Sequence, residues 1–288
     1  MARPAARRNR RLVIATASAV ALCATISGCV AMATEGSGVS AGPRNSAGPG
    51  NGGDPSNGAG GSGSSAGGDK GRSPGAASSP SAKPPARVSA EITHESEDPG
   101  KTVNLTIDDG PEPGWTVKVL ALLEKYDAKA TFCIIGSRAQ EYPDLVKKVT
   151  AAGHRLCDHS VDHNTAMDKR AESYQEAQVL DAQKMIEKAA GEGARVSYYR
   201  APGGAFTPYS REVAASHGMR PLGWNVDTHD WQNPGVDRIV ETVKKGMKEG
   251  PTVLFHDGGG NRGQTVAALE RLLPWFKEQG YTFSYPKI

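Results

Sequence analysis

Two adjacent carboxylates, Asp108 and Asp109, are the residues of this 288-residue chain whose types and position most clearly suit chemistry. They follow the apolar run 103–107, which has the length and β-branched content of a buried strand, and Gly110-Pro111 ends that run at once. Because successive side chains of a strand point to opposite faces, one Asp can face a metal while its neighbour faces a substrate. The alternative is a turn that uses Asp and Gly only for its backbone shape.

A pair of histidines, His159 and His163, has the spacing of metal ligands. Two imidazoles four residues apart can face one ion on a helical turn. The pair alone is weak support, because the seven histidines of the chain give roughly 0.2 such pairs by chance. It gains weight from its position just after a predicted strand. Two histidines with a carboxylate form a common catalytic zinc arrangement, and Asp109 is the obvious third ligand.

Alternating strand and helix patterns must position these residues. The apolar runs are 103–107, 131–135, 155–157, 196–199, 220–224, 252–255 and 282–285, and the helical patterns are 116–126, 143–152, 173–190, 207–217, 236–248 and 264–279. Such alternation predicts parallel strands with right-handed crossovers, in a closed barrel or an open doubly wound sheet. In both folds the active site lies at the carboxyl ends of the strands, so residues far apart in sequence are expected to meet there.

Five short motifs follow these runs in order. They are Thr106-Ile107-Asp108-Asp109-Gly110, His159-Ser160-Val161-Asp162-His163, Arg200-Ala201-Pro202-Gly203-Gly204, Asp227-Thr228-His229-Asp230-Trp231 and Leu254-Phe255-His256. From about residue 101 to the C-terminus, this ordered set resembles the NodB-type polysaccharide deacetylases of carbohydrate esterase family four. The resemblance implies an α/β fold: a distorted, incomplete (β/α)7-type barrel with parallel strands and the active site at their C-terminal ends.

The resemblance also implies roles around a metal. Asp109, His159 and His163 would hold Zn²⁺, or another divalent metal such as Co²⁺, and a bound water whose pKa falls toward about 7. Asp108 would be the general base that takes a proton from that water. Arg200 would pair with Asp108 and keep it ionised, because a nearby opposite charge favours the charged form.

The last motifs would supply the general acid and the substrate pocket. His256 would protonate the leaving amine, and Asp230 would hold its ring, with Asp227 as the alternative. The backbone N–H of Gly203 would share the oxyanion with the metal. The family usually has an aromatic residue there, so this chain keeps the donor and loses a side-chain wall. Trp231 would line the acetyl pocket or a sugar face, with core packing as the alternative.

Cys133 and Cys157 are the only cysteines of residues 96–288, one in the second predicted strand and one closing the third. If those strands are neighbours, the thiols come within reach of a disulfide, which persists in an exported protein. Buried free thiols are the next alternative, and metal ligation by Cys157 is the least favoured.

The N-terminal third of the chain has the composition of an export signal and a tether. Residues 1–28 form a signal peptide and end in Ile26-Ser27-Gly28-Cys29, which resembles a bacterial lipobox with Cys29 as the lipidated residue. Residues 29–95 form a disordered Gly/Ser/Pro-rich linker, and residues 96–288 form the catalytic domain. Removing residues 1–28, which hold five Arg and no acid, changes the formal charge from +3 to −2, so no nucleic-acid partner is indicated.

These features together predict an exported enzyme, anchored by lipid to the outer face of the cell membrane or secreted, and monomeric. Its membrane contact would be through the N-terminal lipid alone. Its substrate would be an acetylated polysaccharide that contains N-acetylglucosamine, either peptidoglycan or chitin, from which it removes N-acetyl groups. An acetylxylan esterase is the nearest alternative, because the same site cleaves acetyl esters. A non-catalytic carbohydrate-binding lipoprotein is less favoured, since no ligand or base is missing from the motifs.

Overall fold

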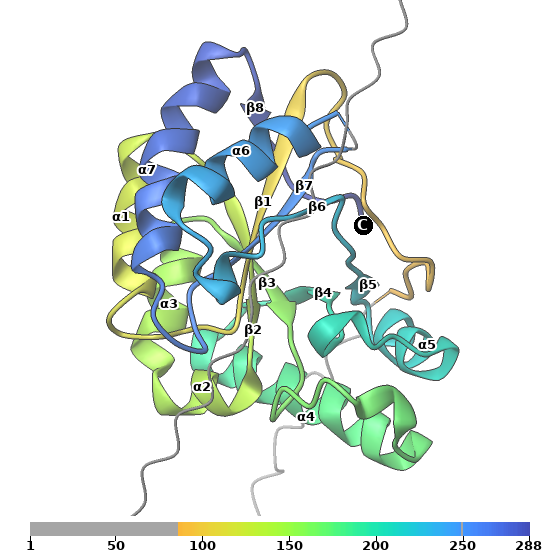
Figure 1. Ribbon diagram of the computed structural model, residues 1–288. Helices are drawn as coiled ribbons and strands as arrows, with labels where there is room; N and C mark the ends of the chain where they lie inside the picture. The colour runs from red at the N-terminus through yellow and green to blue at the C-terminus, as the bar shows by residue number, and fades with distance from the viewer. Residues whose placement is uncertain (1–85, 249) are drawn as a thin grey trace, which may run out of the picture. The chain divides into compact units, whose positions relative to one another are not determined.

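A computed structural model describes residues 86–248 and 250–288, which fold around one parallel sheet (Figure 1). The predicted signal peptide, Cys29 and most of the predicted linker lie outside the described residues. Among the helices of the described part, none combines the length and apolar character needed to cross a membrane.

Eight strands are present in the described residues. They are β1 (Thr102–Asp108), β2 (Ala130–Ile134), β3 (Arg155–Asp158), β4 (Val196–Tyr199), β5 (Arg220–Pro221), β6 (Val226–Asp227), β7 (Thr252–His256) and β8 (Thr282–Phe283). The main path runs β5-β4-β3-β2-β1-β7-β6 with parallel pairing throughout, and β8 pairs with the start of β1. No pairing joins β5 to β6 within the described part, so the barrel is incomplete. The fold implied by the resemblance is confirmed.

The central strand β1 fixes the level of the site. All seven of its residues are buried, as expected for a parallel strand covered on both faces. Asp108, its last residue, is in register with Cys133 of β2 and with His256 of β7. The carboxyl ends of three central strands therefore lie side by side, which brings the first and last motifs together.

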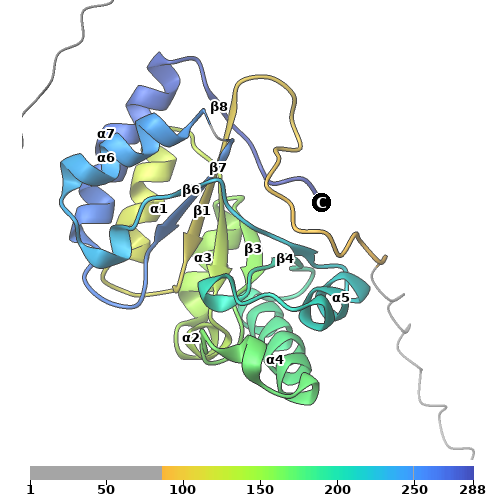
Figure 2. The ribbon, with the colours of Figure 1, turned by 45° about the vertical axis from the view of Figure 1, so that its right-hand side comes forward.

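Helices surround the sheet in the same order as the strands. They are α1 (Thr116–Lys125), α2 (Gly136–Glu141), α3 (Pro143–Ala151), α4 (Glu172–Ala190), α5 (Pro208–Ser216), α6 (Val236–Gly246) and α7 (Gly263–Glu278), with short 3-10 turns η1 (Met167–Lys169), η2 (Pro202–Gly204) and η3 (Asp230–Gln232). Contacts link α5 to α4, α4 to α3, α3 to α1, α1 to α7 and α7 to α6. Figures 1 and 2 show α1, α6 and α7 near the β1, β7 and β6 end of the curved sheet, and α4 and α5 near the β4 and β5 end. Each helix buries one apolar face, as Ile239, Val240 and Val243 do for α6.

The structure differs from the sequence-based elements mainly around the open side of the barrel. The predicted run 220–224 contains only the two-residue β5, and both β6 and α2 were not predicted. Between β5 and β6, Thr93 forms a parallel bridge with Leu222, and its N–H donates to the carbonyl of Pro221 at 2.9 Å. The hydroxyl of Thr252 donates to the carbonyl of His94 at 2.8 Å. Packed structure therefore begins before residue 96, the boundary that the sequence indicated.

Candidate active site

The predicted site residues converge at the carboxyl ends of the strands. Asp108 ends β1 and His256 ends β7, while His159 follows β3 and Arg200 follows β4 directly. Asp230 begins η3, just after β6. One cavity of about 510 Å³ is lined by Asp108, His159, Arg200 and His256. Its wall also contains Asp109, His163, Gly203, Trp224, Asp227 and Trp231, while Asp230 lies outside it. A hollow of about 570 Å³ between α1 and α3 contains none of them, so the first cavity is the candidate site.

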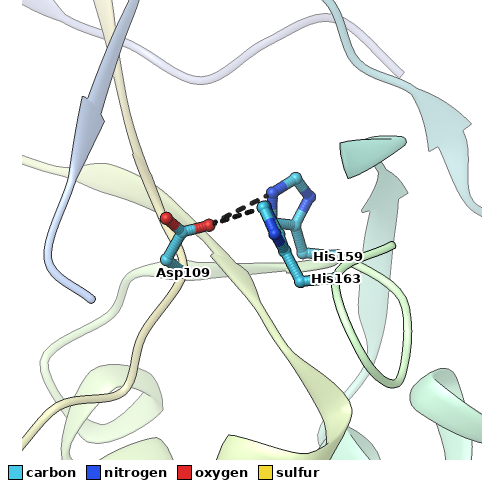
Figure 3. A group of neighbouring side chains, drawn as sticks. All are labelled: Asp109, His159 and His163. Atoms are coloured by element: carbon cyan, nitrogen blue, oxygen red, sulfur yellow. Dashed lines mark ion pairs between the residues drawn. The ribbon is translucent and has the colours of Figure 1, made fainter. Parts of the chain in front are cut away.

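Three ligand atoms meet at one point in this cavity (Figure 3). Oδ1 of Asp109 lies 3.1 Å from Nε2 of His163 and 3.5 Å from Nε2 of His159, and the three ligand atoms lie within 4.8 Å of one another. Asp109, Ser160 and His163 have positive φ values of 75°, 64° and 57°, so the two loops turn sharply to aim these side chains inward.

The donor set fits a divalent metal such as zinc. Nδ1 of His159 lies 2.8 Å from the carbonyl of Arg200, which can only accept, so Nδ1 carries the proton and Nε2 keeps its lone pair. Oδ1 of Asp109 is buried and accepts no hydrogen bond within the described residues. Burial would raise the pKa of Asp109, yet the two imidazoles hold it well below its ordinary value. Burial would lower the pKa of His163, but the Asp109 carboxylate raises it. The site therefore offers one ionised carboxylate and two histidine side chains, a ligand set that zinc prefers.

Asp108 forms a buried ion pair beside these ligands. Its Oδ1 accepts from Nη1 of Arg200 at 2.7 Å, and both side chains are almost fully buried. Its Oδ2 faces Nε2 of His159 at 3.6 Å. The guanidinium also donates to Thr106 Oγ1 at 2.9 Å, to the Leu222 carbonyl at 3.1 Å and to the Gly223 carbonyl at 2.8 Å. One oxygen of Asp108 is thus held fast while the other points to the metal ligands.

His256 is held by Asp230. Nδ1 of His256 donates to Oδ1 of Asp230 at 2.7 Å, while Oδ2 of Asp230 accepts from the His256 N–H at 2.9 Å and from the Thr265 hydroxyl at 2.7 Å. Burial would lower the pKa of His256, but the hydrogen bond and charge of Asp230 raise it above its ordinary value. Burial would raise the pKa of Asp230, but the hydrogen bond and charge of His256 lower it below its ordinary value. Asp227, the alternative supporter, instead accepts from the backbone N–H of His229 at 2.8 Å.

Gly203 and Trp231 lie in the wall of the cavity. Gly203 has φ of 60° within η2, and a Cβ there would lie 3.3 Å from Cβ of Thr165. A larger residue at this position would need Thr165 to move. Trp231 is 49% exposed, which excludes core packing, and Trp224 is half-buried in the same wall. Both indoles are therefore available to a ligand.

Two buried residues, one beside the cavity and one in its wall, were not predicted from the sequence. Asp257 follows His256, accepts from the Thr116 hydroxyl at 2.6 Å, and has its pKa raised to about 7, chiefly by burial. Arg262 lies further along the same loop and lines the cavity. Their positions after the Leu254-Phe255-His256 motif, at the carboxyl end of a predicted strand, were the signal that could have found them.

Cys133 and Cys157, in register on the neighbouring strands β2 and β3, are joined in a disulfide with their Cα atoms 4.1 Å apart. The carbonyl of Cys133 accepts from the N–H of Asp109 at 3.2 Å, and Cys157 lies two residues before His159. The disulfide thus ties β3, which leads into His159, to β2, the neighbour of β1, which leads into Asp109.

A carboxylate and two imidazoles beside a buried Asp–Arg pair and a His–Asp pair define a hydrolase site at the mouth of an incomplete barrel. Comparison with known proteins identifies the family. A family model described as polysaccharide deacetylase matches residues 95–222. The chain is 42% identical over 194 residues to a peptidoglycan-N-acetylglucosamine deacetylase of Bacillus cereus, which covers 67% of this chain and 89% of that protein. It is 36% identical over 192 residues to a chitooligosaccharide deacetylase of Sinorhizobium fredii, covering 62% and 87%.

Among solved structures, that of a carbohydrate esterase family four pseudoenzyme from Bacillus anthracis matches with a TM-score of 0.62 and 28% identity, over 68% of this chain and 67% of that one. The chain therefore belongs to the polysaccharide deacetylase family. It is a hydrolase of the class that acts on carbon–nitrogen amide bonds, as the motifs predicted. Because a pseudoenzyme shares this fold, catalysis depends on the residues of the site and not on the fold alone.

Proposed function

We propose that this protein removes N-acetyl groups from polysaccharide that contains N-acetylglucosamine, with peptidoglycan or chitin as the polymer. The convergence of Asp109, His159 and His163 beside the buried Asp108–Arg200 pair carries this proposal. The names of the two curated relatives, a peptidoglycan-N-acetylglucosamine deacetylase and a chitooligosaccharide deacetylase, support the substrate class.

A zinc ion held by Asp109, His159 and His163 would supply a Lewis acid that polarises the acetyl carbonyl and lowers the pKa of the attacking water. Asp108 accepts the proton of that water at Oδ2, because Oδ1 is occupied by Arg200. Arg200 fixes the rotamer of Asp108 through the 2.7 Å hydrogen bond, which puts the other oxygen on the side of the metal ligands.

His256 delivers a proton to the leaving amine from Nε2, because Nδ1 is occupied by Asp230. The raised pKa of His256 favours the protonated form, which a general acid needs. The backbone N–H of Gly203 donates to the oxyanion, and the exposed indole of Trp231 offers an apolar face to the acetyl group or to a sugar ring. Each step uses a group on the wall of the same cavity.

The test is acetate release from chitooligosaccharides, peptidoglycan fragments and acetylated xylan, with products analysed by mass spectrometry. We expect a mass loss of one or more acetyl groups from the first two substrates, and release slowed by about 10²–10⁴-fold in Asp108→Asn run in parallel. Acetate released from xylan alone would make the protein an ester hydrolase and would overturn the proposal.

We also propose that the chain is exported and held as a monomer at the outer face of the membrane by lipid on Cys29. The lipobox-like sequence and the small-residue linker support this proposal. Labelling with a fatty-acid analogue in a bacterial host is expected to mark the wild type and not Cys29→Ala, which should be released to the medium. Equal labelling of both would refute the anchor.

A further inference from the structure

Arg262 is a second arginine of the active-site cavity, and the mechanism above does not use it. It lies in the loop between β7 and α7, directly before the first residue of α7, and its side chain lines the cavity that holds Asp108, Asp109 and His256. Only 3% of the residue is exposed. It is therefore a fixed charge inside the site.

The hydrogen bonds of Arg262 are all to neutral groups. Its Nε donates to the carbonyl of Gly258 at 2.6 Å, and its Nη1 donates to the carbonyl of Trp231 at 3.3 Å. Within residues 86–248 and 250–288, no carboxylate forms an ion pair with it and its Nη2 donates no hydrogen bond. A buried cation without an ion-pair partner is costly to maintain. A ligand that brings a negative charge would remove that cost.

The other arginine of the cavity, Arg200, already has a counter-charge in Asp108, and four of its five N–H groups are occupied. Its three nitrogens already donate to Asp108, to Thr106 and to two backbone carbonyls. An incoming anion would have to compete with the Asp108 carboxylate for that guanidinium. Arg262 is thus the cavity guanidinium that can form a new charge-assisted hydrogen bond.

The position of Gly259 shows how close Arg262 lies to the metal-ligand residue Asp109. Its φ is +72°, and a Cβ built on it would lie 3.0 Å from Oδ2 of Asp109 and 3.3 Å from Nη2 of Arg262. The guanidinium edge and the metal-ligand carboxylate therefore both reach the space beside this one glycine. An anion held by Arg262 would lie next to the metal site.

The start of α7 adds to the positive potential at this point. The helix runs for 16 residues from Gly263, and its first turn contains no acidic residue. The N-terminal end of a helix carries a partial positive charge, which favours an anion close to Arg262.

We propose that Arg262 forms a carboxylate-binding subsite in the wall of the active-site cavity. This rests on the proposed deacetylation, which supplies two carboxylates of the right kind. One is the acetate product, and the other is a carboxylate substituent on the sugar next to the reacting one, such as the lactyl group of N-acetylmuramic acid. Planar, bidentate recognition of a carboxylate is the interaction for which a guanidinium is best suited.

Direct binding is the first test. Arg262→Gln removes the charge and keeps a hydrogen-bond donor near the two carbonyls. Arg262→Lys keeps the charge but lacks the paired N–H groups of a guanidinium. Arg271→Gln is the matched control, because it removes an Arg from the exposed face of the same helix. Acetate and neutral acetamide are titrated into zinc-loaded and metal-free protein and followed by NMR. We expect Arg262→Gln to weaken acetate binding by about ten- to a hundredfold, the loss of one charge-assisted hydrogen bond, with acetamide unchanged. Equal weakening of both would mean that Arg262 only holds the loop and would overturn the proposal.

Kinetics separate the two sources of carboxylate. If the ligand is product, Arg262→Gln raises the inhibition constant of acetate and leaves KM unchanged for all substrates. If the ligand is a substrate substituent, KM rises for an oligosaccharide that contains muramic acid and stays constant for a neutral chitooligosaccharide. A variant that matches wild type in both respects, or that raises KM for neutral and anionic substrates alike, refutes the subsite. Wild-type protein that binds acetate through Arg262 but deacetylates no substrate would refute the proposed function and leave the subsite intact.

Discussion

Asp108→Asn tests the central assignment, because it removes the proposed proton acceptor and keeps the shape of the side chain. The amide oxygen can still accept from Nη1 of Arg200 across the 2.7 Å hydrogen bond, so the site geometry should persist. A neutral amide cannot take a proton from water, and loss of a general base typically lowers turnover by about 10²–10⁴-fold. We expect that fall in kcat with little change in KM.

The same variant has a predictable effect on stability. Arg200 is fully buried, and in Asp108→Asn it keeps three neutral acceptors but loses its counter-charge. Loss of this buried counter-charge, with the hydrogen bond to the guanidinium kept, should cost about 1.5–3 kcal/mol. This is less than the roughly 3–5 kcal/mol of a broken buried pair, because a hydrogen bond remains. At about 2–4 °C per kcal/mol for a domain of this size, Tm should fall by roughly 3–12 °C.

The assay measures acetate release well below the Tm of the variant, with thermal unfolding and zinc affinity measured on the same preparation. Asp144→Asn is the control, since that side chain is 85% exposed and pairs with Lys147 at the surface. Unchanged turnover in Asp108→Asn would reject Asp108 as the base. Loss of zinc together with turnover would make Asp108 a metal ligand instead and would refute the division of roles argued above.

Three further predictions follow from the site. His163→Ala should weaken zinc affinity by more than the roughly 10–100-fold that is typical of losing a residue that only supports a ligand. Chelation should abolish activity until zinc is added back, and full activity in metal-free protein would contradict the three-ligand site. Burial lowers and Asp230 raises the pKa of His256, with a net rise, so Asp230→Asn should move the alkaline limb of kcat/KM to lower pH; an unmoved limb would exclude His256 as the acid that Asp230 supports. The disulfide between Cys133 and Cys157 spans 24 residues, so the double Ser variant should lose about 3 kcal/mol in urea unfolding; equal stability with and without the bond would show that it contributes nothing.

Local patterns predicted most of the elements. The strand run 103–107 and the helical pattern 173–190 correspond to β1 and α4, because apolar spacing and end signals are properties of neighbouring residues. The short α2 was missed for a tertiary reason: a Cβ on its first residue, Gly136, would lie 3.0 Å from the Cα of Ala182 in α4. That helix depends on a close approach that no local pattern records.

The sequence by itself determined the motifs, their order after successive strands, and so the family and the likeness of the site to a metal-dependent hydrolase. It left open whether Asp227 or Asp230 supports His256. Only the tertiary structure decided for Asp230, which forms two hydrogen bonds with His256, a residue 26 positions further along the chain. The structure alone also brought Arg262 into the cavity wall. Burial and hydrogen-bond partners depend on segments that meet only in the folded chain, whereas motif residues are set by the chemistry that each must perform.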